Sequence, residues 1–284
     1  MKIGVTGATG QLGRLVVEAL LAKGPAGDIV AIVRDPAKAA DLAAKGVEVR
    51  AANYEDRASL DAALTGLDKV LLVSSSELGR RAAQHCNVID AAKAAGVKQF
   101  VYTSAPKATT STLVLAPEHK ATEEYLMASG LPYTILRNNW YTENYAQSVK
   151  MACDTGAVVA AAGAGKVASA TRADYAAGAA AVLTGKGYEN RVYELSGDYA
   201  WDFNELAAAV AEATGKPCAY QPITVDDLVA GMVQSGMDEN VARFFAAVDG
   251  NIADGALGEA TPVLSGLIGR PTTPLKETVK KLVG

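Results

Sequence analysis

The sequence is poor in the residues that build metal clusters and disulfide frameworks. In 284 residues it has three cysteines, Cys86, Cys153 and Cys218, and two histidines, His85 and His119. An odd number of widely spaced cysteines fits neither a set of disulfides nor a zinc cluster. We therefore expect no metal site, and we expect a reducing cytoplasm to be the compartment.

Long runs of one residue class are also missing. No uninterrupted apolar stretch approaches the roughly 20 residues that a membrane-spanning helix needs, and Arg14 and Glu18 break the apolar pattern near the N-terminus, which does not read as a cleavable signal. Charges of both signs are mixed, and the formal net charge is -4. We expect neither a membrane span nor a nucleic-acid partner.

What the sequence has instead is an alternation of short β-branched runs with alanine-rich helical patterns. The apolar runs in the first half are KIGVT, DIVAIV, VEVRAA, KVLLVSS, KQFVYTS and PYTILR. Most of them are continuous, which indicates strands covered on both faces, and several helical patterns end in glycine, as a left-handed C-cap prefers. The alternation predicts an α/β fold of the Rossmann type, with a doubly wound parallel sheet.

The alternation loosens after Arg137. TRADYAAGAAAVLTG still predicts a helix, and RVYELSG predicts a strand that rejoins the sheet, whereas the segments beyond it are mainly helical. We therefore predict a nucleotide-binding domain over residues 1–155, with residues from about 165 to 197 rejoining its sheet. Residues 198–284 are predicted to form a smaller, mainly helical substrate-binding lobe.

A glycine-rich segment, TGATGQLG, lies between the first predicted strand and the first predicted helix. Gly7, Gly10 and Gly13 are three residues apart, a spacing that allows a tight turn, lets a pyrophosphate approach the backbone and lets helix pack on strand. The alternative is a glycine-rich turn without a ligand. The candidate dinucleotide-binding residues are Gly7, Ala8, Thr9, Gly10, Gln11, Leu12 and Gly13.

Arg34 ends the second predicted strand, where NAD enzymes usually carry an acidic residue for the ribose 2′-hydroxyl. A guanidinium there suits the 2′-phosphate of NADP, so NADPH is the expected cofactor. The alternatives are that Asp35, the next residue, serves NAD, or that Arg34 is a solvated charge. Ser74, Ser75 and Ser76 end the fourth strand, where small hydroxyls can lie along a cofactor or simply form a polar loop.

These motifs together resemble the NmrA-like branch of the atypical short-chain dehydrogenases. Within this branch the chain is most similar to the bacterial type 2 NADPH-dependent quinone oxidoreductases, with the triphenylmethane dye reductases as relatives. The resemblance implies NADPH bound across a Rossmann domain and a substrate cleft between that domain and the C-terminal lobe. It runs over nearly the whole chain and is carried by TGATGQLG, AIVRDPAKA, LLVSSSE, AAKAAGVKQFVYTS, GLPYTILRNNWYTENY, SATRADYAAGAA, and VYELSGD followed by Trp201.

The resemblance also implies which residues form the rest of the site. Asn139 departs from the pattern, which has glycine at this position, and so adds a side chain near the cleft. The aromatic rings of Trp140 and Tyr141 offer flat surfaces to an aromatic acceptor, whose oxygen Asn138 or Asn144 can orient; the alternative is that these rings only pack. The implied residues at the nicotinamide end and the cleft are Asn138, Asn139, Trp140, Tyr141, Thr142, Glu143 and Arg172.

Most short-chain dehydrogenases place an acid on a Tyr-x-x-x-Lys helix, and this chain lacks that pair. The matching positions hold Leu115 and His119. Reduction of a ketone generates a basic alkoxide that needs a positioned acid, whereas reduction of a quinone gives a phenolate of roughly pKa 10 that water can protonate. The missing tyrosine therefore argues against carbonyl reduction and is compatible with quinone or dye reduction.

His119 has an ordinary pKa near 6.5, so it is either a proton donor or hydrogen-bonding partner in the site or a structural residue of its helix. The candidate catalytic residues are His119, Asn138 and Tyr141. The predicted function is an NADPH-dependent reductase that transfers a hydride to a quinone or a similar flat conjugated acceptor. The alternative is a non-catalytic NADP(H)-sensing regulator of the NmrA-like type; both are compatible with a homo-oligomer.

Overall fold

The computed structural model describes all 284 residues, and its contacts divide the chain into two compact units. Unit 1 contains residues 1–109, 115–138 and 172–194, and unit 2 contains residues 110–114, 139–171 and 195–284. The predicted boundary at residue 155 differs from this division, because residues 139–155 belong to unit 2. Residues 165–171, expected to rejoin the first domain, also belong to unit 2.

Unit 1 is built on a seven-stranded sheet whose strand order is that of a doubly wound fold. Neighbouring strands from β1 to β6 pair in parallel, with Val5 opposite Ala31 on one side and Leu71 on the other. All six apolar runs of the first half form strands, and RVYELSG rejoins the sheet beside β6, as predicted. The order is β3 (Glu48–Ala51), β2 (Ile29–Val33), β1 (Ile3–Thr6), β4 (Lys69–Leu72), β5 (Gln99–Ser104), β6 (Tyr133–Asn138) and β9 (Arg191–Leu195).

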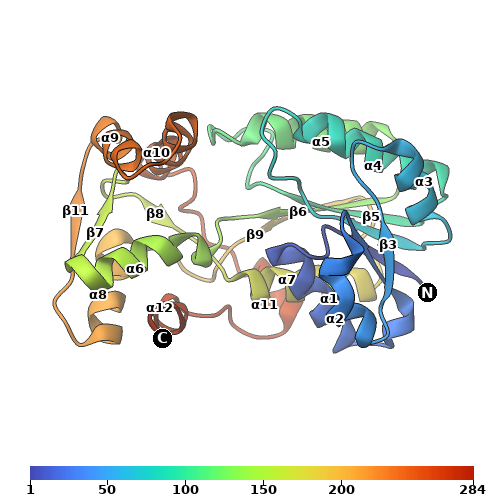
Figure 1. Cartoon of the computed structure of the whole chain (residues 1–284), viewed down its shortest axis with the longest axis horizontal. Helices are drawn as coiled ribbons and strands as arrows, with labels where there is room; N and C mark the ends of the chain where they lie inside the picture. Colours follow the sequence, from blue (N-terminus) through green and yellow to red (C-terminus); the bar gives the residue numbers. More distant parts are fainter. The chain divides into compact units, whose positions relative to one another are not determined.

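Helices cover both faces of this sheet. Figure 1 shows α3, α4 and α5 on one face and α1 and α7 on the other. The four strands β1, β2, β4 and β5 bury every residue, as expected for a sheet that is covered on both faces. The helices of unit 1 are α1 (Gln11–Leu21), α2 (Ala40–Ala44), α3 (Arg57–Leu64), α4 (Arg81–Ala94), α5 (Ala116–Ala128) and α7 (Arg172–Thr184), with 3-10 turns at Ala26–Asp28 and Pro36–Ala39.

Unit 2 is mainly helical and contains two short two-stranded sheets. β10 pairs with β8 in antiparallel fashion, and β11 pairs with β7 in parallel. Trp201 is buried, and its indole N–H donates to the Ser169 hydroxyl at 2.9 Å. The elements are η3 (Thr142–Tyr145), α6 (Ala146–Thr155), β7 (Ala157–Ala160), β8 (Lys166–Val167), β10 (Trp201–Asp202), α8 (Phe203–Thr214), β11 (Ala219–Pro222), α9 (Val225–Gln234), α10 (Glu239–Ala253), α11 (Val263–Ile268) and α12 (Leu275–Val283).

Glycine ends several helices in the left-handed conformation. Gly156, Gly215 and Gly269 cap α6, α8 and α11 with φ values of 72°, 70° and 71°, where a residue with a Cβ atom would be strained. The longest helix, α10, has 15 residues. None of the helices combines the length and the apolar character needed to cross a membrane.

Candidate functional site

The glycine loop joins β1 to α1 at the carboxyl edge of the sheet. Gly7 has a φ of +59°, and its carbonyl accepts a hydrogen bond from the Gly10 N–H at 2.8 Å. A Cβ atom on Gly13 would lie 2.3 Å from the Gly7 carbonyl oxygen, so the first turn of α1 can lie against the loop only if residue 13 is glycine. The loop therefore has the tight geometry that the sequence predicted.

The N-terminus of α1 is open to an anion. Gly10 is the N-cap, it makes no side-chain capping bond, and the first turn of α1 contains no acidic residue. The first N–H groups of a helix and its macrodipole favour a negative group at this end. Of the other loop residues, Ala8 and Leu12 are buried, Thr9 is half-buried and Gln11 is exposed. A cradle of glycines before such a helix end fits the pyrophosphate of a dinucleotide.

Arg34 follows β2 at the same edge of the sheet. Its side chain is 76% exposed, and its guanidinium lies 3.3 Å from the Glu77 carboxylate. Asp35 is engaged locally, because its carboxylate caps the next turn by accepting from the Ala37 N–H at 3.0 Å. Arg34 is therefore an accessible positive charge at this strand end, which fits a 2′-phosphate better than it fits a 2′-hydroxyl.

The serines after β4 lie next to the glycine loop. Two hydrogen bonds tie the start of this segment to the neighbouring strands. The Thr6 hydroxyl of β1 accepts from the Val73 N–H at 3.1 Å, and the Thr103 hydroxyl of β5 accepts from the Ser74 N–H at 2.9 Å. Ser74 and Ser75 are half-buried, and Ser76 is exposed. The structure thus brings the glycine loop, Arg34 and the three serines to one edge of the sheet, as predicted.

His85 holds this serine segment, although no motif of the sequence marks it as part of the site. The Ser75 N–H donates to its Nε2 atom at 2.9 Å, so Nδ1 carries the proton and faces the Thr122 hydroxyl at 3.0 Å. Burial lowers the pKa of His85 to about 3. Arg81 completes the support by donating from Nε to the Ser75 carbonyl at 2.7 Å.

His119 lies on α5 and is 5% exposed. Its Nδ1 atom is 2.7 Å from the hydroxyl of Tyr102 on β5. Burial, with the positive charge of Arg81, lowers the pKa of His119 well below its ordinary value. The imidazole is therefore neutral at neutral pH and has no imidazolium proton to give, so the geometry favours the structural alternative.

A buried ion pair supports the ends of β5, β6 and β9. Glu123 is fully buried and accepts from Arg137 at 2.6 Å and from the Ser104 hydroxyl at 2.6 Å. Arg137 also donates to Glu194 at 2.8 Å. The hydrogen bonds to Glu123 raise the pKa of Arg137, so the guanidinium stays charged, and its contacts brace three strand ends.

The segment predicted at the nicotinamide end falls on both sides of the division between the units. Asn138 ends β6 and is buried in unit 1, and Arg172, half-buried, begins α7 in the same unit. Residues 139–143 belong to unit 2. There Tyr141 makes a parallel bridge to Ala170, Thr142 shares a 2.8 Å hydrogen bond with Ser169, and Glu143 is half-buried in η3.

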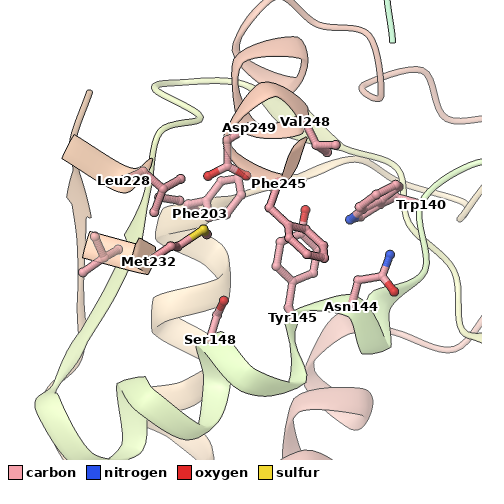
Figure 2. A pocket seen from close by; sticks show the side chains of 12 residues that line it. Trp140, Asn144, Tyr145, Ser148, Phe203, Leu228, Met232, Phe245, Val248 and Asp249 are labelled. Carbon is pink, nitrogen blue, oxygen red and sulfur yellow. The ribbon is translucent and has the colours of Figure 1, made fainter. Parts of the chain in front are cut away.

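Asn139, which stands where the related pattern has glycine, has defined partners in the structure. Its side chain is buried, its Oδ1 atom accepts from the Trp140 N–H at 2.6 Å, and its Nδ2 atom donates to the Leu257 carbonyl at 3.2 Å. The carboxamide is therefore hydrogen-bonded to the backbone of unit 2 through both of its polar atoms. Trp140 and Asn144 line a pocket within unit 2 (Figure 2).

Comparison with known proteins also indicates a dinucleotide-binding chain. The sequence model of a family described as NAD(P)H-binding matches residues 7–186. Quinone oxidoreductase 2 of Escherichia coli (strain K12) is 52% identical over 280 residues, which cover 99% of this chain and 98% of that protein. The match therefore includes residues of both units.

Two solved structures are similar over their whole length. The NADPH-dependent quinone oxidoreductase QOR2 of Escherichia coli complexed with NADPH matches with a TM-score of 0.96 at 51% identity, covering 99% of this chain and 100% of the other. The Citrobacter sp. triphenylmethane reductase complexed with NADP(H) matches with a TM-score of 0.96 at 42% identity, with the same coverage. Both are proteins whose structures were solved with the nucleotide.

Proposed function

Because this chain belongs to the NAD(P)H-binding family, we propose that it is an NADPH-dependent reductase that transfers a hydride to a quinone or a similar flat conjugated acceptor. The observation that carries the proposal is the glycine loop at the open N-terminus of α1, with Arg34 exposed beside it. The 52% identity to a quinone oxidoreductase supports the acceptor class.

The residues at the carboxyl edge of the sheet fit NADPH. The cradle at Gly7, Gly10 and Gly13, where a Cβ atom on Gly13 would strike the loop, holds the pyrophosphate, and Arg34 holds the 2′-phosphate. Ser74 to Ser76 line the cofactor, and Asn138 and Arg172 of unit 1 contribute to its nicotinamide end. When bound, NADPH supplies the hydride.

The protein's own contribution is orientation rather than acid catalysis. His119 is neutral and hydrogen-bonded to Tyr102, and position 115 holds leucine where the related dehydrogenases have tyrosine. A quinone accepts a hydride to give a phenolate, which water protonates. We assign His119 a positioning role in α5, and we assign contact with the acceptor to Asn138 and Tyr141.

The regulator alternative is not favoured. The full-length relatives and solved structures that match at 42–52% identity are named as a quinone oxidoreductase and a triphenylmethane reductase. A regulator that senses NADP(H) needs the same glycine loop and Arg34, so only turnover separates the two functions.

The first test is NADPH oxidation, followed by absorbance with a simple benzoquinone as the acceptor and with NADH in parallel. Steady oxidation above the rate without protein, and a preference for NADPH, are expected. Tight NADPH binding without turnover would contradict the reductase and support the regulator.

Replacement of Arg34 by alanine tests the cofactor preference. Loss of charge-assisted hydrogen bonds to a phosphate is expected to raise the KM for NADPH by about 10- to 100-fold and to change the KM for NADH by less than about 3-fold. Arg57→Ala is the matched control, because Arg57 is an exposed arginine of α3 that pairs with Asp61. Equal effects of the two substitutions would remove Arg34 from the cofactor site.

A further inference from the structure

Unit 2 contains a pocket of its own, and most of the residues that line it have no role in the proposed hydride transfer. It holds about 90 Å³ and lies among α6, β7, α8, α9 and α10. Its walls are mostly aromatic and aliphatic, and its polar groups are few. It is lined by Trp140, Asn144, Tyr145, Ser148, Val159, Ala160, Phe203, Leu228, Met232, Phe245, Val248 and Asp249 (Figure 2).

Aromatic side chains from three elements form the walls. The Tyr145 ring packs edge-on against Phe203 with centroids 5.7 Å apart, and against the buried Trp201 with centroids 5.1 Å apart. Trp140 and Phe245 complete this aromatic lining. Such faces carry negative electrostatic potential and attract cations that have lost part of their hydration shell.

Asp249 on α10 is the one charged residue of the lining. Its Oδ2 atom accepts from the Ala161 N–H at 2.9 Å, and it makes no salt bridge with a basic residue of the chain. Burial raises the pKa of Asp249 to about 6. Asp249 is half-buried, and a partly desolvated carboxylate without a counter-ion is costly, so a cationic ligand would relieve that cost.

Tyr145 supplies a second unused polar group. The residue is 7% exposed, and its buried hydroxyl has no hydrogen-bond partner. Figure 2 shows this hydroxyl end pointing toward α10, which carries Asp249, while the Asp249 carboxylate points from α10 into the same space. A buried hydroxyl without a partner is rare in a native protein unless a ligand satisfies it.

We propose that this pocket binds the protonated nitrogen of an alkylated amine. The N–H donates to the Asp249 carboxylate or to the Tyr145 oxygen, and the alkyl groups contact the aromatic rings and the side chains of Leu228 and Met232. An anionic ligand is excluded because the lining contains Asp249 and no lysine or arginine. The proposal goes beyond the reductase activity, and its binding test does not depend on that activity.

The amine can be part of an acceptor or a separate ligand, and binding is therefore measured first, without NADPH or quinone. The probes are dimethylaminoethanol, which is cationic at pH 7.5, and its uncharged isostere 3-methylbutan-1-ol, each titrated by calorimetry. The amine is expected to bind at least about 10-fold more tightly than the isostere, as a cation beside a carboxylate and aromatic faces should. Equal binding of the two compounds, or no binding of either, would overturn the proposal.

Substitutions of residues in the pocket test whether the amine binds there. Asp249→Asn is expected to weaken amine binding by at least about 10-fold and Tyr145→Phe by a smaller factor, whereas Asp254→Asn, an exposed change at the end of the same helix, leaves it unchanged. Thermal unfolding checks the fold, and Asp249→Asn is expected to unfold at the same or a higher temperature at pH 7.5. Unchanged amine binding in a folded Asp249→Asn variant would overturn the proposal.

A quinone that carries a dimethylaminomethyl group shows whether the bound amine is part of the acceptor or a separate ligand. If the amine belongs to the acceptor, this quinone has a KM at least about 10-fold below that of the parent quinone, and Asp249→Asn removes the difference. If the amine is a separate ligand, the two KM values are equal while the calorimetric binding persists. Absence of any NADPH oxidation would sink the proposed reductase function but leave the calorimetric test intact.

Discussion

His85 and His119 show how two buried side chains can make unit 1 sensitive to acid. Both are hydrogen-bonded as neutral imidazoles, His85 to the Ser75 N–H and His119 to Tyr102. Burial lowers the pKa of His85 to about 3 and that of His119 well below its ordinary value. The unfolded chain takes up these protons near pH 6.5, so acid favours unfolding.

The change in the free energy of unfolding with pH that is due to His85 has a definite sign and size. Its pKa is lower in the folded state, so the stability it contributes is present above pH 6.5 and is lost as the pH falls from 6.5 toward 3. The loss attributable to His85 between pH 7.5 and pH 5 is about 2 kcal/mol. Urea unfolding at both pH values measures it.

The control for that measurement is His85→Gln, whose amide oxygen can still accept from the Ser75 N–H. The free energy of unfolding of this variant should fall by about 2 kcal/mol less than that of the unsubstituted chain over the same pH interval. An identical fall in both proteins would mean that His85 does not titrate as the structure indicates.

Individual residues were predictable from the sequence only where a local motif marks them. Gly7 and Gly13 belong to such a motif, and the structure gives them the predicted roles. His85 has its partners at Ser75 and Thr122, 10 and 37 residues away, so no short pattern reveals them. The same is true of Tyr145 and Asp249, which share a pocket although 104 positions (249 minus 145) separate them.

At the scale of elements, the β1–α1 connection is the most constrained part of unit 1. A Cβ atom on Gly13 would lie 2.3 Å from the Gly7 carbonyl oxygen and 2.8 Å from the carbonyl carbon, and both belong to the backbone. Neither atom can move without moving the end of β1. The loop and the helix therefore keep their relative positions only while residue 13 is glycine.

Gly13→Ala is expected to weaken NADPH binding by more than about 10-fold and to lower the free energy of unfolding by about 1–3 kcal/mol, because the loop must shift. Calorimetric titration with NADPH measures the first effect and urea unfolding the second. Gly24→Ala is the matched control, since a Cβ atom there meets nothing within 4 Å. NADPH binding by Gly13→Ala at the affinity of the unsubstituted chain would contradict the placement of the pyrophosphate on this loop.

The strands and helices themselves were largely predictable, because continuous apolar runs and glycine caps are local signals. All seven strands of the large sheet and the helix over Arg172–Thr184 were predicted. The sequence did not predict that residues 139–171 belong to unit 2, because no change of composition marks the point where the chain leaves β6. Contacts such as the bridge between Tyr141 and Ala170 decide it.

At the scale of the whole molecule, neither unit is one continuous segment. Unit 1 takes α7 and β9 from residues 172–194, after the chain has passed through residues 139–171 of unit 2. α7 packs along α1, so it covers one face of the unit. A fragment that ends at residue 155 lacks both elements.

That fragment, residues 1–155, is expected to fail as an independent domain. Without α7, the side of α1 that packs against it has lost its cover. We expect broad, non-cooperative thermal unfolding and binding of a hydrophobic dye, measured by circular dichroism and fluorescence against the full chain. A sharp transition without dye binding would show that the predicted boundary at residue 155 is a real domain boundary.

The position of β9 at the end of the sheet also has a consequence for synthesis. β6 ends at Asn138, and its neighbour β9 begins at Arg191. At about 5–20 residues per second, a ribosome needs several seconds to make the chain between them. During that time β6 is an unpaired edge on the nascent chain, open to pairing with other chains, so the yield of folded protein should depend on how fast this stretch is translated.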